Sequence, residues 1–298
     1  MKRVLVLMST YNGEKYLTEQ LDSIFRQNGA EISLLVRDDG SSDGTVGILE
    51  KYAESFPLYI ISGENIGPAK SFLELIIRAP EADFYALADQ DDVWADDKIK
   101  TALQKIGQYD QPALYCSNLT VTDEKLNAVQ DLPLPLNVQT DFMSVALDPG
   151  YYFGCTMVFN RKMKMIIEQK GNPGKMIMHD LWLALTASYS GILVYDSRSF
   201  IRYRNHTGNY TVQRKKNSLS AKLSEVKDKR KVTIAEQCSA FIDYMGIAPS
   251  AGAGAYTISR YPESFSDRMK LCLLTLKRKD MKSTRKIRTV LRILNKTY

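Results

Sequence analysis

The sequence has little of what zinc-thiolate, disulfide-bonded or membrane-spanning proteins require. Its 298 residues include only four cysteines and two histidines, with no CxxC pair, which argues against a zinc site. Scattered free thiols suit a reducing compartment. No apolar run approaches the length of a membrane-spanning helix, and the apolar run at the N-terminus is too short for a signal peptide. We therefore expect a cytoplasmic protein.

Two common nucleotide-binding motifs are also missing. There is no GxxxxGK sequence, which excludes a P-loop, and no GxGxxG follows the first apolar run, which excludes a dinucleotide-binding fingerprint. Any nucleotide site in this chain must be built from other residues.

Short apolar runs alternate with segments of helical periodicity over the first 118 residues. The runs predict buried strands at residues 3–8, 32–37, 58–61, 84–88 and 113–117. Asp43 and Pro68 are typical of helix starts. This alternation predicts an α/β fold with a mostly parallel central sheet flanked by helices. Ligands of such sheets bind at the carboxyl ends of the strands, so the polar loops after the first four strands should share one edge.

The alternation weakens after residue 118. Residues 123–150 are expected to form a long excursion and residues 151–159 a strand. Helices are predicted from residue 160 and from residue 179, the second ending at Gly191, and a strand follows it. From about residue 212 the pattern predicts helices with Lys and Arg on one side, interrupted by a loop over residues 249–256.

An acidic cluster follows the fourth predicted strand. Asp89, Asp91 and Asp92 lie within four positions, where like charges repel and resist ionisation. A magnesium or manganese ion would offset this repulsion, because both prefer carboxylate oxygens together with phosphate oxygens and water. The alternative is a solvated acidic turn in which Asp92 caps the next helix.

The loop DDGSSDGT follows the second predicted strand. Gly40 and Gly44 permit a tight turn, and the loop could be an ordinary connection between a strand and a helix. Alternatively, a carboxylate at the end of that strand could accept a hydrogen bond from a nucleoside base or ribose.

Several motifs, taken in order, resemble glycosyltransferase family 2, the inverting enzymes with the GT-A fold. They also resemble the bacterial rhamnosyltransferases of surface polysaccharide synthesis. The motifs are MSTYNGEKYLTEQLDSIFRQ, RDDGSSDGT, NIGPAK, ADQDDVW, FGCTMVFNRKM, HDLWLAL and YRNHTGN. The resemblance covers residues 1 to about 212 and implies a nucleotide-diphospho-sugar transferase fold with a helical C-terminal region.

The resemblance also implies roles for individual residues. Asp180 would be the catalytic base, in a His179-Asp180 pair where many members have Glu-Asp. Asp91 would be the main metal ligand, Asp89 would face the metal or the ribose, and His206 could complete the metal site or donate to a diphosphate oxygen. The predicted donor-binding residues are Ser9, Thr10, Tyr11, Asp39, Asn65, Lys70, Asp89 and Arg204. The chain lacks the Gln-x-x-Arg-Trp motif common in the family, which suggests addition of a single sugar rather than polymer synthesis.

The function that the resemblance implies is inverting, Mn²⁺- or Mg²⁺-dependent transfer of a sugar from a nucleotide-diphosphate donor to a saccharide or lipid-linked acceptor. The first candidate donor is dTDP-L-rhamnose, and no nucleic-acid partner is expected. One alternative is a nucleotidyltransferase, although STYNGEKY lacks the Gly-rich basic loop expected there. The other is a non-catalytic nucleotide-sugar binding protein, against which the intact Asp89, Asp91 and Asp180 argue.

The predicted organisation has two parts. Residues 1–212 would form the catalytic domain, with a nucleotide-sugar-binding half at 1–118 and an acceptor-binding half at 119–212. Residues 213–298 would form a basic helical region. Within it, residues 268–298 place Leu, Ile and Val at helical spacing among Lys and Arg, which suits either a packed amphipathic helix pair or a peripheral contact with an anionic membrane.

Overall fold

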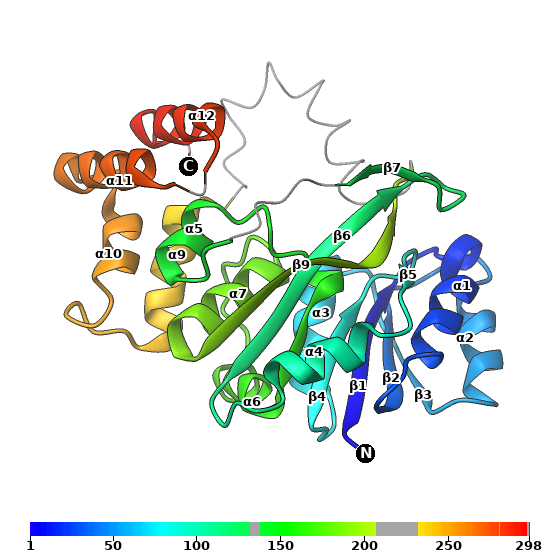
Figure 1. Cartoon of the computed structure of the whole chain (residues 1–298). Coiled ribbons are helices and arrows are strands. Elements are labelled where there is room, and N and C mark those ends of the chain that lie inside the picture. Colours follow the sequence, from blue (N-terminus) through cyan, green and yellow to red (C-terminus); the bar gives the residue numbers. More distant parts are fainter. Residues whose placement is uncertain (132–137, 207–231, 280, 297) are drawn as a thin grey trace.

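A computed structural model describes residues 1–131, 138–206, 232–279, 281–296 and 298. Within these residues a nine-stranded sheet is flanked by helices, and the helices after residue 232 lie together at one side of it (Figure 1). The strands are β1 (Arg3–Thr10), β2 (Glu31–Asp38), β3 (Leu58–Ser62), β4 (Phe84–Ala88), β5 (Val93–Trp94), β6 (Ala113–Thr122), β7 (Ala128–Asp131), β8 (Val158–Asn160) and β9 (Ile192–Arg204).

The helices connect these strands and then continue beyond them. Those within the sheet region are α1 (Glu14–Phe25), α2 (Thr45–Ala53), α3 (Pro68–Arg78), α4 (Lys98–Ile106), α5 (Phe142–Leu147), the short 3₁₀ helix η1 (Gly154–Thr156), α6 (Arg161–Lys170) and α7 (His179–Ser190). Those after it are α9 (Ile234–Met245), α10 (Ala253–Arg260), α11 (Phe265–Lys277) and α12 (Ser283–Leu294).

The sheet is mostly parallel, as the sequence predicts. Its order is β3-β2-β1-β4-β8-β6-β9-β5, with β7 paired to β6. The long pairings, β1 with β2 and β6 with β9, are parallel, whereas the three-residue strand β8 runs antiparallel between β4 and β6. Thr10 lies opposite Asp38 and Met8 opposite Ala88, so the loops after β1, β2 and β4 emerge at one edge. That prediction is confirmed.

Five local predictions are wrong, each because a short-range pattern does not reveal tertiary contacts. The apolar segment 151–159 is mostly not a strand: η1 precedes β8, and most of its buried apolar residues are divided between the two hydrophobic core clusters. The predicted loop at 249–256 contains the start of α10. Gly44, not Asp43, is the N-cap of α2, and Asp97, not Asp92, is the N-cap of α4. The excursion at 123–150 includes β7 and α5.

The last helices share the main hydrophobic core. Leu271 and Cys272 of α11 and Ile293 of α12 are at most 4% exposed, in the same cluster as Trp182 of α7. Tyr298 is also buried there, and Tyr261 Oη donates to its carbonyl over 2.7 Å. One face of each C-terminal helix is therefore packed. Among the described residues, every helix is too short or too polar to span a bilayer.

Candidate active site

The acidic cluster lies at the carboxyl end of β4. Asp91 Oδ2 lies 2.8 Å from His206 Nε2, which joins this loop to the segment after β9. Oxygens of Asp89 and Asp92 and the Cys155 sulfur all lie within 4.8 Å of one another. Asp92 is fully buried, and its Oδ2 has no hydrogen-bond partner within the part of the chain that the structure describes. The structure thus pairs His206 with Asp91 and brings Asp89 close to Asp92 and Cys155, and the metal-ligand set Asp89, Asp91 and His206 stays a prediction.

The electrostatics of this cluster fit a divalent cation. Burial, together with the charges of Asp91 and Asp180, raises the pKa of Asp89 to about 7. Burial likewise raises the pKa of Asp92 well above its ordinary value. The charges of Asp91 and Asp89 raise this pKa as well. Crowded carboxylates that resist ionisation gain most from a bound cation, and their hard oxygens match Mg²⁺ or Mn²⁺.

Residues 89–92, which carry the acidic cluster, are called the acidic loop. Buried amide and hydroxyl groups of helix α1 and of the residues just after it hold this loop and the segment that follows it. Gln20 Nε2 donates to the Asp89 carbonyl over 2.9 Å, and Ser23 Oγ accepts from the Trp94 amide at 3.0 Å. Gln27 Nε2 donates to the Ala95 carbonyl over 2.8 Å. The sequence analysis missed these residues. Their signal was present, since Gln20 and Ser23 lie three positions apart on the buried side of α1 and Gln27 follows just after the helix ends.

Arg204 lies behind the acidic loop and is 1% exposed. Its Nε donates to the Asp91 carbonyl over 3.0 Å, its Nη2 to Glu19 Oε2 over 2.9 Å, and its Nη1 to the Glu124 carbonyl. The guanidinium also lies 4.4 Å from the centre of the Tyr16 ring. Burial and these partners turn the guanidinium toward the protein, and the predicted role of Arg204 in donor binding stays a prediction. Arg204 is a positioning residue for the loop.

The loops after β1 and β2 are tied to each other and to the acidic loop. The Tyr11 amide donates to Gln90 Oε1 over 2.8 Å, and Gln90 Nε2 donates back to the Tyr11 carbonyl over 3.0 Å. The Asn12 amide donates to Ser41 Oγ over 2.9 Å. The Tyr11 side chain remains 48% exposed, so its ring is accessible beside the site.

Two other predicted donor residues face inward. Thr10 Oγ1 is buried and donates to Asp38 Oδ1 over 2.8 Å, so Thr10 shapes the loop and does not face the open edge. Asp39 is 3% exposed, forms an ion pair with Arg37, and accepts from the Gly67 amide at 2.9 Å. Asp39 therefore fastens the loop after β3 to β2. A contact with a nucleoside through this carboxylate remains a prediction.

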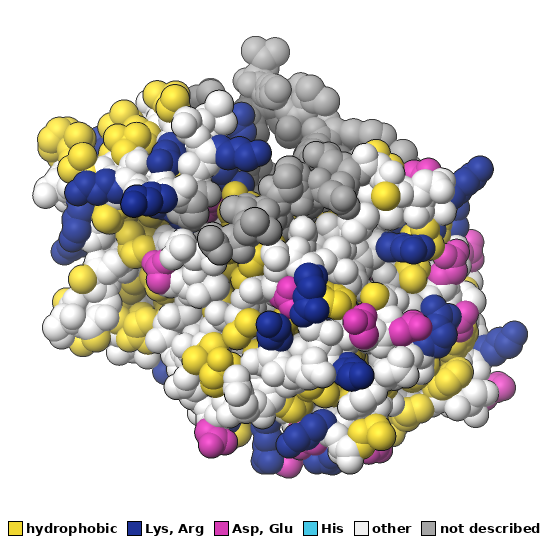
Figure 2. Space-filling view, viewed as in Figure 1, with side chains coloured by type: hydrophobic (Ala, Val, Ile, Leu, Met, Phe, Trp, Pro, Cys, Tyr) yellow, Lys and Arg dark blue, Asp and Glu magenta, His cyan; other side chains and the backbone are white. Residues whose placement is uncertain are grey.

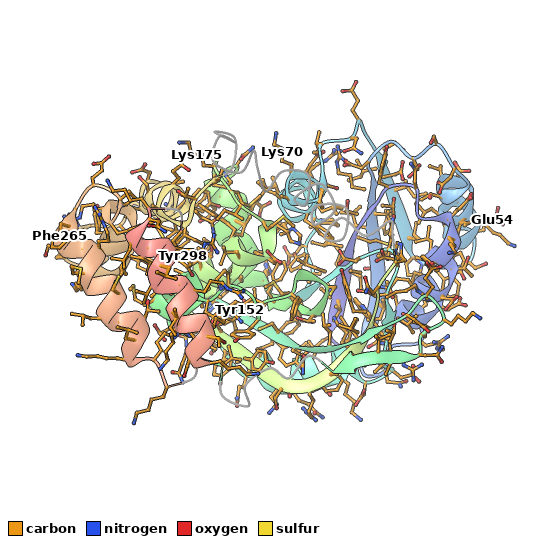
Figure 3. All side chains as sticks on the ribbon, turned by 90° about the horizontal axis from the view of Figure 1, so that it is seen from above. Glu54, Lys70, Tyr152, Lys175, Phe265 and Tyr298 are labelled. Carbon is orange, nitrogen blue, oxygen red and sulfur yellow. The ribbon has the colours of Figure 1, made fainter. Side chains whose placement is uncertain are left out.

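The remaining donor candidates lie around α3. Ser9 Oγ is 2.7 Å from Ser71 Oγ, and Asn65 Oδ1 accepts from the Gly67 amide at 3.1 Å. Lys70 is exposed in the first turn of α3, where its ammonium points to solvent (Figure 3). These residues belong to the same edge of the sheet as the loops above, and their contact with a ligand stays a prediction.

Asp180 begins α7 close to the acidic loop. Its Oδ1 accepts from the Leu181 amide at 2.6 Å. Burial raises its pKa, backbone hydrogen bonds from its own helix start and from Gly154 partly offset the rise, and the resulting pKa is about 6. Its charge in turn raises the pKa of Asp89, which shows that the two carboxylates are close. Asp89 and Asp180, which are 91 positions apart in the chain, thus lie near each other in the folded protein.

His179 packs beneath Asp180 as a neutral ring. It stacks on Phe72 with ring centres 4.2 Å apart, and neither ring nitrogen has a hydrogen-bond partner among the described residues. Burial lowers its pKa to about 3, so the ring stays uncharged at neutral pH. A Cβ atom added at Gly154 would lie 2.6 Å from His179 Nε2. The close approach of η1 to the start of α7 therefore requires glycine at this position.

Substitution of Gly154 by Ala should destabilise the protein by about 1–3 kcal/mol, the usual cost of overpacking a core. The matched control is Gly47→Ala in α2, where an added Cβ meets nothing within 4 Å. That substitution should be neutral or raise the free energy of unfolding by up to about 1 kcal/mol. Urea unfolding of both variants measures the difference. Equal stability of the two variants would contradict the tight packing of η1 against His179.

Comparison with known proteins identifies what the chain resembles. The family model "Glycosyl transferase family 2" matches residues 5–165. The chain is 32% identical over 218 residues to the dTDP-rhamnosyl transferase RfbG of Shigella flexneri, a match that spans 68% of this chain and 72% of that protein. It is 31% identical over 118 residues to the poly(ribitol-phosphate) beta-N-acetylglucosaminyltransferase TarS of Staphylococcus aureus, which covers 38% of this chain and 20% of that protein.

Solved structures show the same fold at low sequence identity. Staphylococcus aureus TarS 1-349 in complex with UDP-GlcNAc has a TM-score of 0.56 and 17% identity, over 99% of this chain and 72% of that chain. The mannosyltransferase PcManGT from Pyrobaculum calidifontis, in complex with GDP-Man and Mn²⁺, has a TM-score of 0.53 and 16% identity, over 99% and 87% of the two chains.

Proposed function

Because the chain belongs to glycosyltransferase family 2 and is a glycosyltransferase with the GT-A fold, we propose that it is a metal-dependent, inverting enzyme. It moves one sugar from a nucleotide-diphosphate donor to a saccharide or lipid-linked acceptor in the synthesis of a bacterial surface polysaccharide. Membership of the family favours this reading over a nucleotidyltransferase and over a non-catalytic binding protein.

The observation that carries the proposal is the meeting of Asp180 with the acidic loop. The base that deprotonates the acceptor and the site that binds the donor diphosphate must be close together, because the sugar being transferred lies between them. The contribution of the Asp180 charge to the raised pKa of Asp89 supports a shared electrostatic environment for the two carboxylates. The exposed Tyr11 ring and the loops after β1 and β2 adjoin that environment, where a nucleoside could stack.

Asp91, Asp89 and His206 would hold Mn²⁺ or Mg²⁺, which when bound neutralises charge on the diphosphate leaving group. The acidic loop must not move as the charge on the diphosphate grows, since preorganised groups stabilise a transition state best. Gln20 and Arg204 supply that rigidity through their bonds to the Asp89 and Asp91 carbonyls.

Asp180 accepts the proton of the acceptor hydroxyl as that oxygen attacks the anomeric carbon. With a pKa of about 6, the carboxylate is mostly ionised at neutral pH yet basic enough to take a proton. One base and one direct displacement invert the configuration of the sugar. Retention would need a second carboxylate acting as the nucleophile.

The proposed donor is dTDP-L-rhamnose. The support is the 32% identity to the Shigella flexneri dTDP-rhamnosyl transferase RfbG over 68% of this chain. The proposed location is the cytoplasm, with peripheral contact at the inner face of the cell membrane, where a lipid-linked acceptor would be reached. The four cysteines form no disulfide and are all buried, which suits a reducing compartment.

The donor assignment predicts a ranked thermal shift. With Mn²⁺ present, dTDP-L-rhamnose should raise the melting temperature more than UDP-GlcNAc or GDP-mannose, because a ligand at a hundred times its Kd stabilises the native state by about 2.7 kcal/mol. The same preparation should hydrolyse the preferred donor slowly without acceptor, and a chelator should stop this. With acceptor, a β-linked donor should give an α-linked product by proton NMR.

Three outcomes would contradict parts of this proposal. A retained anomeric configuration would refute the single displacement. Binding of the donor without hydrolysis or transfer under any condition would indicate a binding protein. Release of pyrophosphate from a nucleoside triphosphate and a sugar phosphate would indicate a nucleotidyltransferase.

A further inference from the structure

Helices α11 and α12 each present two apolar faces, of which only one is packed. Leu271, Cys272 and Thr275 of α11 and Thr289 and Ile293 of α12 face the protein. The other apolar side chains are 38–70% exposed. They are Phe265, Met269, Leu273, Leu274 and Leu276 on α11, and Ile287, Leu291 and Leu294 on α12. We call this set the exposed apolar surface, and Figure 2 shows hydrophobic side chains gathered over these two helices.

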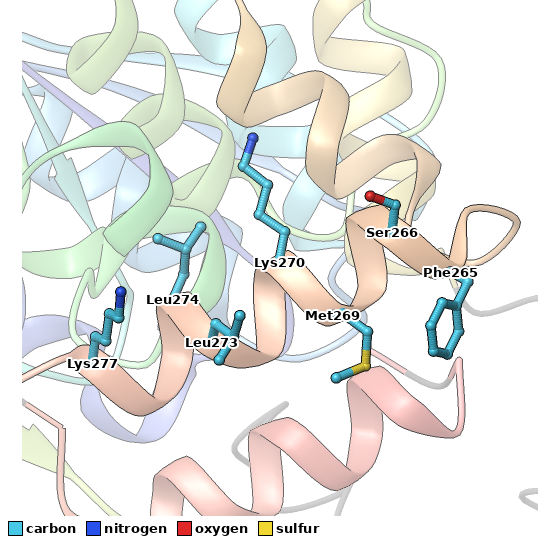
Figure 4. Close-up of a pocket in the computed structure, with 7 residues that line it drawn as sticks. All are labelled: Phe265, Ser266, Met269, Lys270, Leu273, Leu274 and Lys277. Atoms are coloured by element: carbon cyan, nitrogen blue, oxygen red, sulfur yellow. The ribbon is translucent and has the colours of Figure 1, made fainter.

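The spacing of these residues makes each stripe continuous. Phe265, Met269, Leu273 and Leu276 are separated by four, four and three positions, so they lie along one side of α11. Ile287, Leu291 and Leu294 repeat the same pattern on α12. Figure 4 shows Met269, Leu273, Lys270 and Lys277 lining one shallow pocket on α11. An apolar surface of this continuity on a soluble enzyme marks an interaction site.

The positive charge around the exposed apolar surface favours an anionic partner. Residues 265–298 contain eleven Lys and Arg but only two acidic residues, Asp267 and Asp280. Asp267 is committed to an ion pair with Arg260 at 3.2 Å. Lys270, Lys277 and Arg288 are exposed beside the apolar stripes. Apolar side chains bordered by cations match an anionic lipid surface, where the side chains enter the interface and the cations meet headgroups.

The position of the surface also suits a membrane-bound acceptor. The carboxyl ends of β1, β2 and β4, which carry the candidate site, point toward the end of the molecule where α12 lies (Figure 1). Viewed from that end, α11 and α12 lie at one side of the sheet, with Phe265 at the outer rim (Figure 3). A membrane against these helices would therefore lie at the same end of the molecule as the site.

We propose that the exposed apolar surface of α11 and α12 docks the enzyme peripherally on a membrane rich in anionic phospholipid. This deepens the proposed function and rests on it for the lipid-linked acceptor, whereas the binding of lipid rests on the surface alone. The helices do not detach to bind, since their opposite faces belong to the core. Removal of residues 268–298 would therefore unfold part of the protein, and point substitutions are the proper test.

The experiment is co-sedimentation of the full chain with vesicles of phosphatidylethanolamine and phosphatidylglycerol, and with phosphatidylcholine vesicles. Binding is expected to the anionic vesicles only, strong at about 0.05 M salt and weak at about 0.5 M, where charges are screened within a few ångströms. Leu273→Gln with Leu291→Gln, which leaves the charge unchanged, should weaken binding roughly tenfold or more. Lys270→Gln with Lys277→Gln should weaken it roughly fivefold for each cation.

The matched control is Tyr59→Gln on strand β3, a side chain that is 59% exposed, compared with 54% for both Leu273 and Leu291. It should bind vesicles like the parent, and all variants should keep the parental melting temperature. Sedimentation velocity over a range of concentrations follows the oligomeric state. A dimer that Leu273→Gln and Leu291→Gln dissociate would assign the surface to a second copy and overturn the proposal.

Two further results would also overturn it. They are a parent protein that stays in the supernatant with anionic vesicles at low salt, and a double leucine variant that binds like the parent. Donor hydrolysis in solution separates this inference from the enzymatic one. Loss of vesicle binding with parental hydrolysis is the expected behaviour of the variants. Absence of hydrolysis in a parent that binds vesicles would refute the function and leave the surface standing.

Discussion

Replacement of Asp91 by Asn should lower turnover roughly a thousandfold, about 4 kcal/mol of transition-state stabilisation. Asn keeps an oxygen that can accept from His206 at the 2.8 Å position, but it removes the charge that attracts a divalent cation. Loss of that cation leaves the charge of the diphosphate leaving group uncompensated. Turnover with saturating Mn²⁺ and calorimetric titration of Mn²⁺ with nucleotide measure the two effects.

The control for Asp91→Asn is Asp96→Asn, in the same segment between β4 and α4. Asp96 is exposed and lies 3.8 Å from Arg26, a surface pair worth little. This control should retain parental turnover. Both variants should be about as stable as the metal-free parent, because Asp96 is an exposed charge and Asp91→Asn relieves like-charge repulsion in the acidic cluster. Full turnover by a folded Asp91→Asn enzyme would refute the metal assignment.

Replacement of Asp180 by Asn should leave donor affinity within about twofold of the parent while turnover falls about 10²- to 10⁴-fold, the range of general-base contributions. Asn retains an oxygen that can accept from the Leu181 amide, so the start of α7 should keep its geometry. Donor binding and turnover must be measured on one preparation. Weak donor binding with nearly normal turnover would remove Asp180 from the base role.

The pKa of Asp180 adds a pH dependence to the same prediction. A base must be ionised to accept a proton, and the group is protonated below a pKa of about 6. Turnover of the parent should therefore rise with pH through about 6 and then level, at saturating metal. The residual turnover of Asp180→Asn should lack that rise. Asp267→Asn, which alters an acid in the first turn of α11, is the matched control and should keep it.

Much of the fold and of the site could be predicted from local patterns. Buried parallel strands are short continuous apolar runs, so β1 to β4 were evident, and the chain direction of a parallel sheet brings their following loops to one edge. The acidic cluster after β4 was evident from the same patterns, whereas the role of Asp180 was indicated only by the resemblance to the family. A charged group directly after a buried strand needs a compensating partner, and the sequence alone shows that Asp89, Asp91 and Asp92 are in that position.

Contacts between distant segments decided the rest. Arg204 and Thr10 look like ligand-binding groups in their motifs, but burial and hydrogen bonds commit both to the protein. The insertion of β8 between β4 and β6 depends on pairing across more than forty residues of chain, for which no local pattern exists.

The C-terminal helices show most clearly which features the sequence determines and which features depend on the tertiary structure. By itself the sequence determined that two basic amphipathic helices would follow the catalytic region. Only the tertiary structure decided which of their apolar side chains are covered, Leu271 and Ile293, and which remain exposed, Leu273 and Leu291. The physical reason is that helical periodicity specifies which residues share a side of the helix, whereas burial depends on what the rest of the chain packs against that side.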